Sequence, residues 1–436
     1  MTASAHRGAI LHCLDDPAAG AEAVELIADG LLLVEDGYVA AVGAYEELAP
    51  GLPESMPVAH HEGRLIVPGF IDCHVHAPQL DMIAAPGKQL LDWLETYTYP
   101  AEMAWADRIR AAQAAGVFLD ALLRHGTTTA LVFATSHSHS VDVLFEAAHA
   151  RGMRLVAGKV LMDRNAPAPL LEPPARAYAE SKALIERWHG RGRLGYAITP
   201  RFAPACSPDM LDIAARLLDE HREVLLQTHL AENAEEAALV ARLFPQARDY
   251  LDVYDRAGLL GARSVFAHAV HLDDDARGRL KAADAAIAFC PTSNLFLGSG
   301  LFDYGAARDA GLRIGLGSDI GAGTTLSLLA TMGEAYKVAQ LRHRTIEAFE
   351  AFHLATLGAA RVLRLEDRIG NLIPGKEADF LVLDPAATPL LAARQKASRS
   401  IAETLFVLMM LGDERAVEAV YVAGARWSDP VAAGRP

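Results

Sequence analysis

The 436-residue sequence predicts an α/β protein, a TIM-like (β/α)₈ barrel that carries a small β-sandwich domain built from both chain termini. Three observations predict this fold class. Apolar strand-like runs alternate with helical runs from residue 68 to residue 364. Short strand-like segments precede and follow that region. Metal-binding residue types stand at the ends of several apolar runs. A composition of 52% hydrophobic and 22% charged residues is typical of a globular protein.

Residues 1–67 are expected to form the N-terminal part of the β domain. The turn signals Asp29-Gly30 and Asp36-Gly37 each predict a hairpin, because Asp-Gly pairs favour the tight turns between antiparallel strands. Four segments have strand character: 9–13, 23–28, 31–35 and 38–42. This unit is too small for a core of its own, so we expect it to pair with the other end of the chain.

Residues 68–364 are expected to form the catalytic barrel. Its strands are nearly continuous apolar runs, which is typical of parallel strands buried on both faces. The eight predicted strands are 65–76, 127–134, 154–162, 195–200, 223–229, 264–268, 285–290 and 313–319. The predicted helices are 101–125, 141–151, 174–189, 208–221, 234–243, 273–283 and 326–340.

Residues 365–436 turn β-like again and are expected to complete the terminal domain. Strand-like segments 378–383 and 417–422 flank a helical stretch at 398–410. Because neither end of the chain can build a core alone, the sequence predicts that the two ends share one domain.

Composition and charge exclude several classes of protein. A formal net charge of −15 argues against nucleic acid or an anionic membrane as a partner. The longest apolar runs, such as 401–411, are too short for a membrane span, and the first residues lack a secretory pattern. The 4 cysteines form no Cys-x-x-Cys pair, so we expect a protein of the reducing cytoplasm.

The strand ends carry the chemistry. His74 and His76 lie two residues apart and would project from the same face of one strand, while His229 and Asp319 end other strands. Carboxyl ends of parallel barrel strands meet at one face of the molecule. The sequence therefore predicts a site with three imidazole ligands and one carboxylate, a set that suits Zn²⁺ or Fe²⁺. Such a metal lowers the pKa of a bound water toward neutrality.

Two further residues complete the predicted centre. Glu232, three residues after His229, is the expected proton shuttle; its alternative role is a charge at the start of the next helix. His268, at the end of another strand, would stabilise developing charge or hydrogen-bond to a neighbouring group. His137 and His139 form a rival His-x-His pair, but no apolar strand leads directly into them.

These segments resemble the amidohydrolase superfamily. The resemblance rests on Pro68-Gly-Phe-Ile-Asp-Cys-His-Val-His76, Gly317-Ser-Asp319 and Ile373-Pro-Gly-Lys-Glu-Ala-Asp379, and it runs from about residue 8 to 425. A narrower set resembles the guanine deaminase family: segments 76–79, 90–102, 227–233 and 290–295. This resemblance implies a homodimeric enzyme of purine catabolism that converts guanine to xanthine and ammonia on one zinc ion per chain.

The resemblance also implies a role for individual residues. The metal positions are His74, His76, His229 and Asp319; the catalytic positions are Glu232, His268 and Asp319; the substrate positions are Gln79, Trp93, Arg201 and Phe202. An Arg can donate to the carbonyl of guanine, and a Gln amide can both donate and accept. Phe202 can cover a ring face. Glu232 would protonate N3 of the purine so that water attacks C2.

Two departures from relatives bear on this assignment. Cys73 stands where many relatives have Thr, a small buried difference that leaves the chemistry unchanged. Relatives with two metals use a carbamylated Lys at a barrel strand end, whereas Lys159 lies inside its strand-like run. One metal is therefore expected.

Two other functions are compatible with the same sequence. One is a different enzyme on this scaffold, such as a deaminase of a cytosine, adenosine or triazine compound or a hydrolase of a cyclic amide; Gln79, Trp93 and Arg201 favour guanine over these. The other is a non-catalytic barrel that serves as a binding or assembly protein. Every expected ligand position is filled, which argues against the second function.

Overall fold

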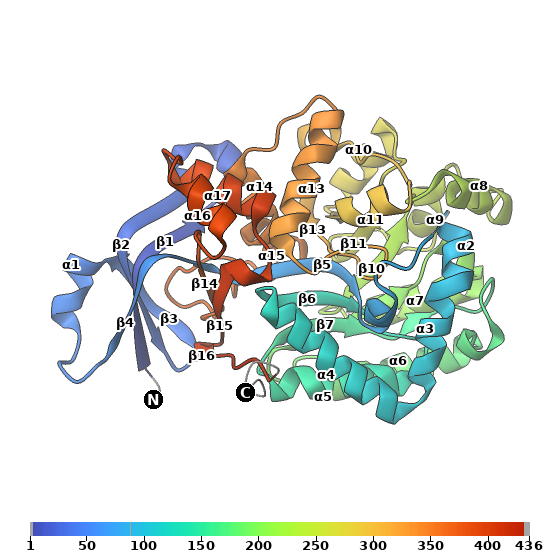
Figure 1. Ribbon diagram of the computed structural model, residues 1–436. Coiled ribbons are helices and arrows are strands. Elements are labelled where there is room, and N and C mark those ends of the chain that lie inside the picture. Colours follow the sequence, from blue (N-terminus) through green and yellow to red (C-terminus); the bar gives the residue numbers. More distant parts are fainter. Residues whose placement is uncertain (1–2, 88, 431–436) are drawn as a thin grey trace.

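The computed structural model describes residues 3–87 and 89–430 and contains two sheets. Figure 1 shows the barrel with its surrounding helices on one side and the sheet formed by both chain ends on the other. The predicted fold class is confirmed.

The barrel sheet consists of eight parallel strands in one path, with β8 (Val160–Leu161) paired beside β9. Two hydrogen bonds join its first strand to the segment that follows its last strand: the Asp319 amide donates to the His74 carbonyl at 2.9 Å, and the His76 amide donates to the Ile320 carbonyl at 3.0 Å. The strands are β5 (Phe70–His76), β6 (Thr127–Phe133), β7 (Arg154–Gly158), β9 (Leu194–Pro200), β10 (Leu225–Leu230), β11 (Ser264–His268), β12 (Ala286–Phe289) and β13 (Arg313–Leu316).

Helices surround the barrel strands (Figure 1). Polar caps fix where several begin: Asp107 and Ser207 each accept amide hydrogen bonds, and Asn233 with Glu236 forms a capping box. The helices are α4 (Arg108–Arg124), α5 (Ser138–Ala150), α6 (Pro174–Trp188), α7 (Pro208–Glu220), α8 (Ala234–Leu243), α9 (Tyr250–Arg256), α10 (Asp274–Ala282), α11 (Pro291–Phe296), α12 (Tyr304–Asp309), α13 (Leu328–Leu341), α14 (Ala348–Ala355) and α15 (Leu357–Val362).

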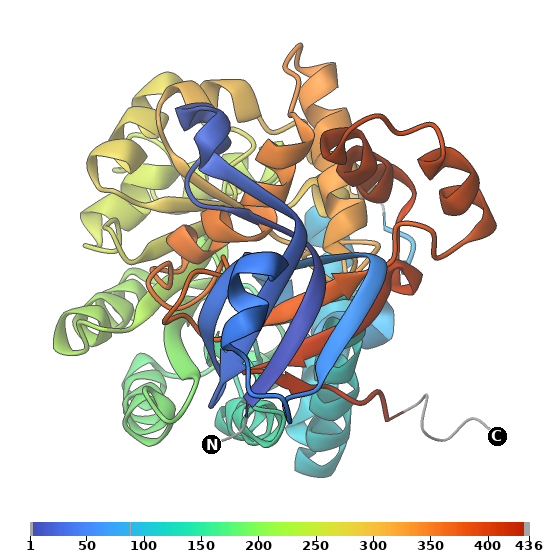
Figure 2. The same ribbon diagram turned by 90° about the vertical axis from the view of Figure 1, so that its left-hand side faces the viewer.

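The terminal sheet draws strands from both ends of the chain (Figure 2). Its order is β16-β15-β14-β4-β1-β2-β3, and antiparallel pairing of β14 with β4 joins the two ends. Ile10, Leu32, Ile66, Phe380 and Tyr421 are buried in its own core. The strands are β1 (Ala3–Cys13), β2 (Val24–Glu35), β3 (Tyr38–Ala44), β4 (Val58–Pro68), β14 (Phe380–Leu383), β15 (Val417–Val422) and β16 (Ala425–Arg426); short α1 (Tyr45–Leu48) follows β3.

One predicted hairpin is wrong. Asp29-Gly30 lies inside the continuous strand β2, where the register with β1 shifts between Gly8 and Ile10. The pair accommodates a bulge instead of a turn. The Asp36-Gly37 hairpin is confirmed, because both residues adopt positive φ (49° and 86°) between β2 and β3.

The single strand predicted for residues 65–76 is two strands. β4 ends at Pro68 in the terminal sheet, and β5 begins at Phe70 in the barrel. A Cβ on Gly69, between them, would lie 2.1 Å from the Thr128 Oγ1, so the chain passes from one sheet to the other where only Gly fits.

Short helices cover the mouth of the barrel between β5 and β6. The helix predicted for residues 101–125 is broken before Asp107, which caps α4. The preceding segments are a 3₁₀ helix (Ala77–Met82), α2 (Leu90–Trp93), a π-helix (Leu94–Thr98), α3 (Tyr99–Met103) and a 3₁₀ turn (Ala104–Ala106).

The helical stretch predicted near the C-terminus is α17 (Ile401–Leu411), preceded by α16 (Pro389–Gln395). Among the described helices, none is both long and apolar enough to span a bilayer.

Candidate active site and metal centre

Three imidazoles and a carboxylate meet at the carboxyl end of the barrel. The His76 Nε2 lies 3.2 Å from both the His74 Nε2 and the His229 Nε2. The Asp319 Oδ1 lies 3.2 Å from the His74 Nε2 and 3.3 Å from the His76 Nε2. All four residues are buried or nearly so. The three imidazole nitrogens form one close group, and the Asp319 oxygen adjoins it at His74 and His76. Such a set of nitrogen and oxygen ligands suits a divalent cation.

The electrostatics of this cluster match a ligand set. Burial lowers the pKa of His76 to about 3, and it lowers the pKa values of His74 and His229 as well, so all three imidazoles are neutral near pH 7. Burial opposes ionisation of Asp319, but the adjacent His74 and His76 hold the pKa of its carboxyl well below its ordinary value. Neutral imidazoles and an ionised carboxylate are the protonation states that metal binding requires.

Hydrogen bonds behind the ligands hold β5 against the end of β13. The buried Asp72 carboxylate accepts the amides of His74 (3.1 Å) and Ser318 (3.0 Å) and the Ser318 hydroxyl (2.5 Å). The His229 Nδ1 lies 2.6 Å from the Arg201 carbonyl, so it carries the proton and its Nε2 faces the cluster. Ligands from distant strands are thereby fixed in orientation.

Glu232 lies beside this cluster and outside it. Its Oε2 is 3.5 Å from the His268 Nε2, and the Ser299 hydroxyl lies 3.5 Å from its Oε1. Burial, and then the negative charge of Asp319, raise the pKa of Glu232 well above its ordinary value. A carboxyl with a raised pKa is better suited to act as a general acid than an ordinary one.

His268 is held by a residue from the next strand end. Its Nδ1 lies 2.9 Å from the Asn294 Oδ1, so Nδ1 donates and the Nε2 lone pair points toward Glu232 and Asp319. The backbone is left-handed at His268 (φ 71°) and Asp319 (φ 51°). Non-glycine residues in this region cost about 1–3 kcal/mol each and concentrate at functional sites.

A second polar group lies on the substrate side of the cluster. The Arg201 Nη1 donates to both oxygens of Glu102 at 2.7 Å, and the Gln79 Nε2 donates to the Glu102 Oε1 at 3.2 Å. The Gln79 Oε1 accepts the Gly321 amide at 3.2 Å. Arg201, Gln79 and Glu102 are all buried. This network places two donors near the predicted metal site.

Aromatic and apolar residues wall the same region. The Phe202 ring centroid lies 6.4 Å from that of His229, and Phe202 also lines a cavity of about 620 Å³ together with Leu94 and Tyr99. Trp93 is buried in the same apolar cluster, and its indole N–H donates to the Ala85 carbonyl at 3.1 Å. Trp93 can therefore offer a substrate an apolar surface, whereas its polar atom is occupied.

The rival residues lie elsewhere. His137 and His139 stack at 5.7 Å at the start of α5, and the His139 Nε2 lies 2.8 Å from the Trp105 carbonyl. Lys159 is fully buried and ion-paired with Glu172. Within residues 3–87 and 89–430, the side chains that could share a cation form two groups that have His74 in common. One group is His74, His76 and His229, and the other is His74, His268, Cys290 and Asp319.

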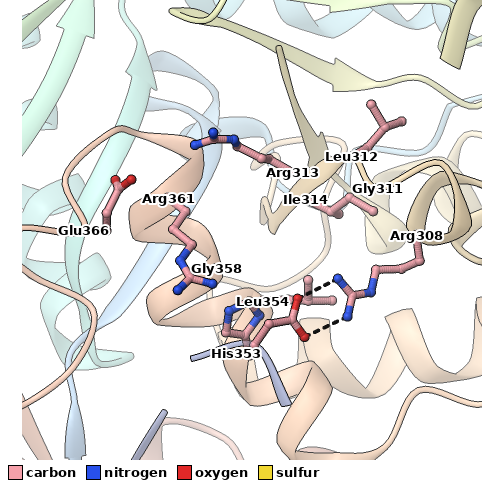
Figure 3. Close-up of a pocket in the computed structure, with 11 residues that line it drawn as sticks. Arg308, Gly311, Leu312, Arg313, Ile314, His353, Leu354, Gly358, Arg361 and Glu366 are labelled. Carbon is pink, nitrogen blue, oxygen red and sulfur yellow. Dashed lines mark hydrogen bonds and ion pairs between the residues drawn. The ribbon is translucent and has the colours of Figure 1, made fainter. Parts of the chain in front are cut away.

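A separate cavity of about 480 Å³ lies at the opposite end of β13, beside Ile314 (Figure 3). Arg308 and Arg361 line it, but each is already paired with an aspartate: Arg308 with Asp16 at 2.7 Å, Arg361 with Asp15 at 2.7 Å. It contains none of the residues predicted for the site.

The sequence did not predict the residues whose hydrogen bonds orient the side chains and backbone of the site. Glu102, Asn294, Asp72 and Glu236 are all buried, and each orients a site residue or its backbone. Glu102 lies on a helix, not at a strand end, and Asn294 follows its strand inside α11. The signal that could have found them is an acidic or amide side chain within an otherwise apolar segment.

Comparison with known proteins gives a consistent result. The amidohydrolase family profile matches residues 65–426. The guanine deaminase of Escherichia coli is 50% identical over 426 residues, covering 97% of each chain, and its solved structure superposes with a TM-score of 0.95 over 98% of this chain and 99% of that one. A guanine deaminase from C. acetobutylicum, solved with guanine bound in the active site, is 28% identical with a TM-score of 0.89 over 98% of this chain and 100% of that one.

Proposed function

The chain belongs to the amidohydrolase family and, within it, to the guanine deaminases, and from this membership we propose that it hydrolyses guanine to xanthine and ammonia in purine catabolism. The observation that carries the proposal is a buried carboxyl, Glu232, that lies 3.5 Å from His268 and on which the charges of both Asp319 and Arg201 act. That arrangement combines a metal-binding set, a proton carrier and donors for a polar heterocycle in one enclosed site.

His74, His76, His229 and Asp319 would hold one Zn²⁺ per chain, and the same set suits Fe²⁺. When bound, such a cation lowers the pKa of water and supplies a nucleophile at neutral pH. Neutral imidazoles and an ionised carboxylate make the protein ready for the cation without prior loss of protons.

Glu232 carries protons between water and the purine. In the proposed reaction its carboxyl protonates N3 of guanine, which makes C2 more electrophilic. The amino group then leaves C2 as ammonia after receiving a proton, and the oxygen of one water replaces it. The ionised Asp319 carboxylate takes a proton from that water and, with Glu232, passes it to the amino group, while the lone pair of the His268 Nε2 orients the water's O–H. Guanine and one water thus yield xanthine and ammonia.

The residues predicted to bind the substrate recognise the edge of guanine that carries the carbonyl at position 6. Arg201 donates to the carbonyl at position 6, and Gln79 donates its second amide N–H to the same edge. Phe202 covers a ring face, and Trp93 contributes to the apolar wall behind it. The cavity of about 620 Å³ that Phe202 lines would be the route by which a planar base reaches the site.

The proposal includes a cellular context. All four cysteines are free and buried, which fits the reducing cytoplasm. A homodimer, implied by the family resemblance, is the expected assembly. Size-exclusion chromatography with light scattering measures the mass directly, and a mass near 46.7 kDa would instead indicate a monomer.

One experiment tests the activity. Purified protein is analysed for bound metal and assayed for ammonia release with guanine, adenine, adenosine, cytosine and an aminotriazine, with and without a chelator. We expect release from guanine alone, abolished by the chelator and restored by Zn²⁺. Release from another heterocycle and not from guanine would identify a different deaminase, and a folded, metal-free protein without any activity would favour a binding function.

A further inference from the structure

We propose that Glu102 is a specificity-determining positioning residue. It holds Gln79 and Arg201 so that both present hydrogen-bond donors to the substrate, and the site thereby selects a purine with a carbonyl at position 6 over one with an amino group there. This inference rests on the proposed guanine deaminase activity.

Glu102 is the only acceptor shared by the two substrate-side residues within the described part of the chain. It is completely buried, and its two oxygens accept Arg201 Nη1 at 2.7 Å each. The Oε1 also accepts the Gln79 Nε2 at 3.2 Å. An uncompensated buried carboxylate is very costly, so the three side chains must adopt their positions together.

The amide of Gln79 can point in only one direction. The Gly321 amide must donate and therefore faces the Oε1 at 3.2 Å, while the Glu102 carboxylate must accept and therefore faces the Nε2. One Nε2 hydrogen is used by Glu102. The second makes no hydrogen bond to the described residues, so Gln79 faces the substrate as a donor.

Arg201 is oriented by the same carboxylate. Its Nη1 donates to the Glu102 carboxylate, and its guanidinium carbon lies 5.3 Å from the centre of the Tyr99 ring. The remaining guanidinium N–H groups make no hydrogen bond to the residues that the structure describes. An arginine fixed at one nitrogen and packed against a ring keeps its other donors pointing in a constant direction.

Two donors side by side discriminate between purines that differ at position 6. A carbonyl oxygen accepts from both, whereas an amino group at that position meets them donor to donor. 2,6-Diaminopurine carries the same 2-amino group as guanine but has an amino group at position 6 and, with it, a lone pair in place of the hydrogen at N1. Its hydrolysis at C2 gives isoguanine and ammonia. A site built on hydrogen bonds rejects an analogue that cannot make them by factors of about 10⁴ or more.

The test compares guanine with 2,6-diaminopurine in the metal-loaded enzyme and in Glu102→Gln. The variant keeps the size of the side chain but removes its charge and replaces one oxygen by an NH₂ group. Because Arg201 Nη1 contacts both oxygens, one of these contacts becomes donor to donor and Arg201 is no longer held. We expect kcat/KM for guanine to fall about 100-fold, chiefly through KM, and that for 2,6-diaminopurine to fall less than about tenfold. The guanine preference then falls at least about tenfold. Glu102→Asp, which keeps the charge with a shorter reach, should give an intermediate preference.

Glu377→Gln is the matched control. Glu377 is also a buried carboxylate paired with two arginines, Arg154 and Arg193, but it lies where the terminal sheet meets the barrel. We expect its loss to lower the melting temperature and to leave the guanine preference unchanged. A folded, metal-loaded Glu102→Gln or Glu102→Asp enzyme with the parent's preference would overturn the inference. A parent enzyme inactive on guanine would overturn the proposed function instead.

Discussion

Replacing Glu232 by Gln separates proton transfer from every other property of the site. The substitution keeps the shape of the side chain and removes its exchangeable carboxyl proton. Glu232 belongs to neither group of side chains that could share a cation, and its nearest polar neighbours, the His268 Nε2 and the Ser299 hydroxyl, are each 3.5 Å away. We therefore expect Glu232→Gln to bind metal as the parent does and to lose turnover.

The expected fall in kcat follows from the role of the Glu232 carboxyl in proton transfer. A positioned general acid or base contributes about 10²–10⁴-fold. Because Glu232 would serve both the ring nitrogen and the leaving amino group, we expect a fall in kcat near the upper limit, or about 4–5 kcal/mol in the barrier. The folded state should not suffer, since burial and Asp319 already disfavour the charged form of Glu232 and a neutral amide avoids that cost.

The assay combines three measurements on the same preparation: xanthine formation from guanine, zinc content, and melting temperature. Glu235→Gln is the matched control, because Glu235 is an exposed carboxylate three residues farther along the chain and should behave like the parent. A metal-loaded Glu232→Gln enzyme that kept more than a tenth of the parent kcat would refute the assignment of Glu232 as proton carrier.

Three further outcomes are expected. Removal of metal by dialysis against a chelator should abolish activity and lower the melting temperature, with a loss of about 4 kcal/mol relative to enzyme in Zn²⁺ at 1,000 times its Kd; unchanged melting would argue against the site. Asn294→Leu removes the acceptor 2.9 Å from the His268 Nδ1, and we expect kcat to fall about 10–100-fold with metal retained. Burial lowers the pKa of His353 from 6.5 to about 4. The stability it contributes is therefore present above pH 6.5 and lost as pH falls toward 4, by up to about 3 kcal/mol. The melting temperature of the parent should drop more steeply than that of His353→Gln between pH 7 and pH 4.5, and parallel curves would contradict this.

The strand-end residues of the site could be predicted because each follows its own apolar run. His229 is the penultimate residue of β10 and His268 is the last residue of β11. The geometry of a parallel barrel brings such ends to one face whatever the intervening helices are. The pattern is local, and the convergence follows from the fold class. For this reason the position of the cluster could be inferred without knowledge of a single long-range contact.

The supporting residues could not be predicted in this way. Glu102 meets Arg201 across 99 residues of sequence, and it lies on a short helix whose place over the barrel mouth depends on packing. The Asp29-Gly30 pair failed as a turn signal because it lies at a bulge: β1 advances two residues from Gly8 to Ile10 while β2 passes three from Gly30 to Ile27, and only the pairing with β1 reveals this. In each case the decisive partner lies far away in the chain, where local periodicity carries no information.

The pairing of β14 with β4 has a consequence for synthesis of the chain. Roughly 300 residues separate the two strands, so at about 5–20 residues per second a ribosome needs roughly 15–60 seconds between making one and the other. During that interval the edge of β4 that β14 later covers, including Ile66 and Val67, has no strand beside it. We expect nascent chains to be vulnerable to aggregation in this interval, because any part of the barrel that folds during synthesis does so while the sheet attached to it is still incomplete.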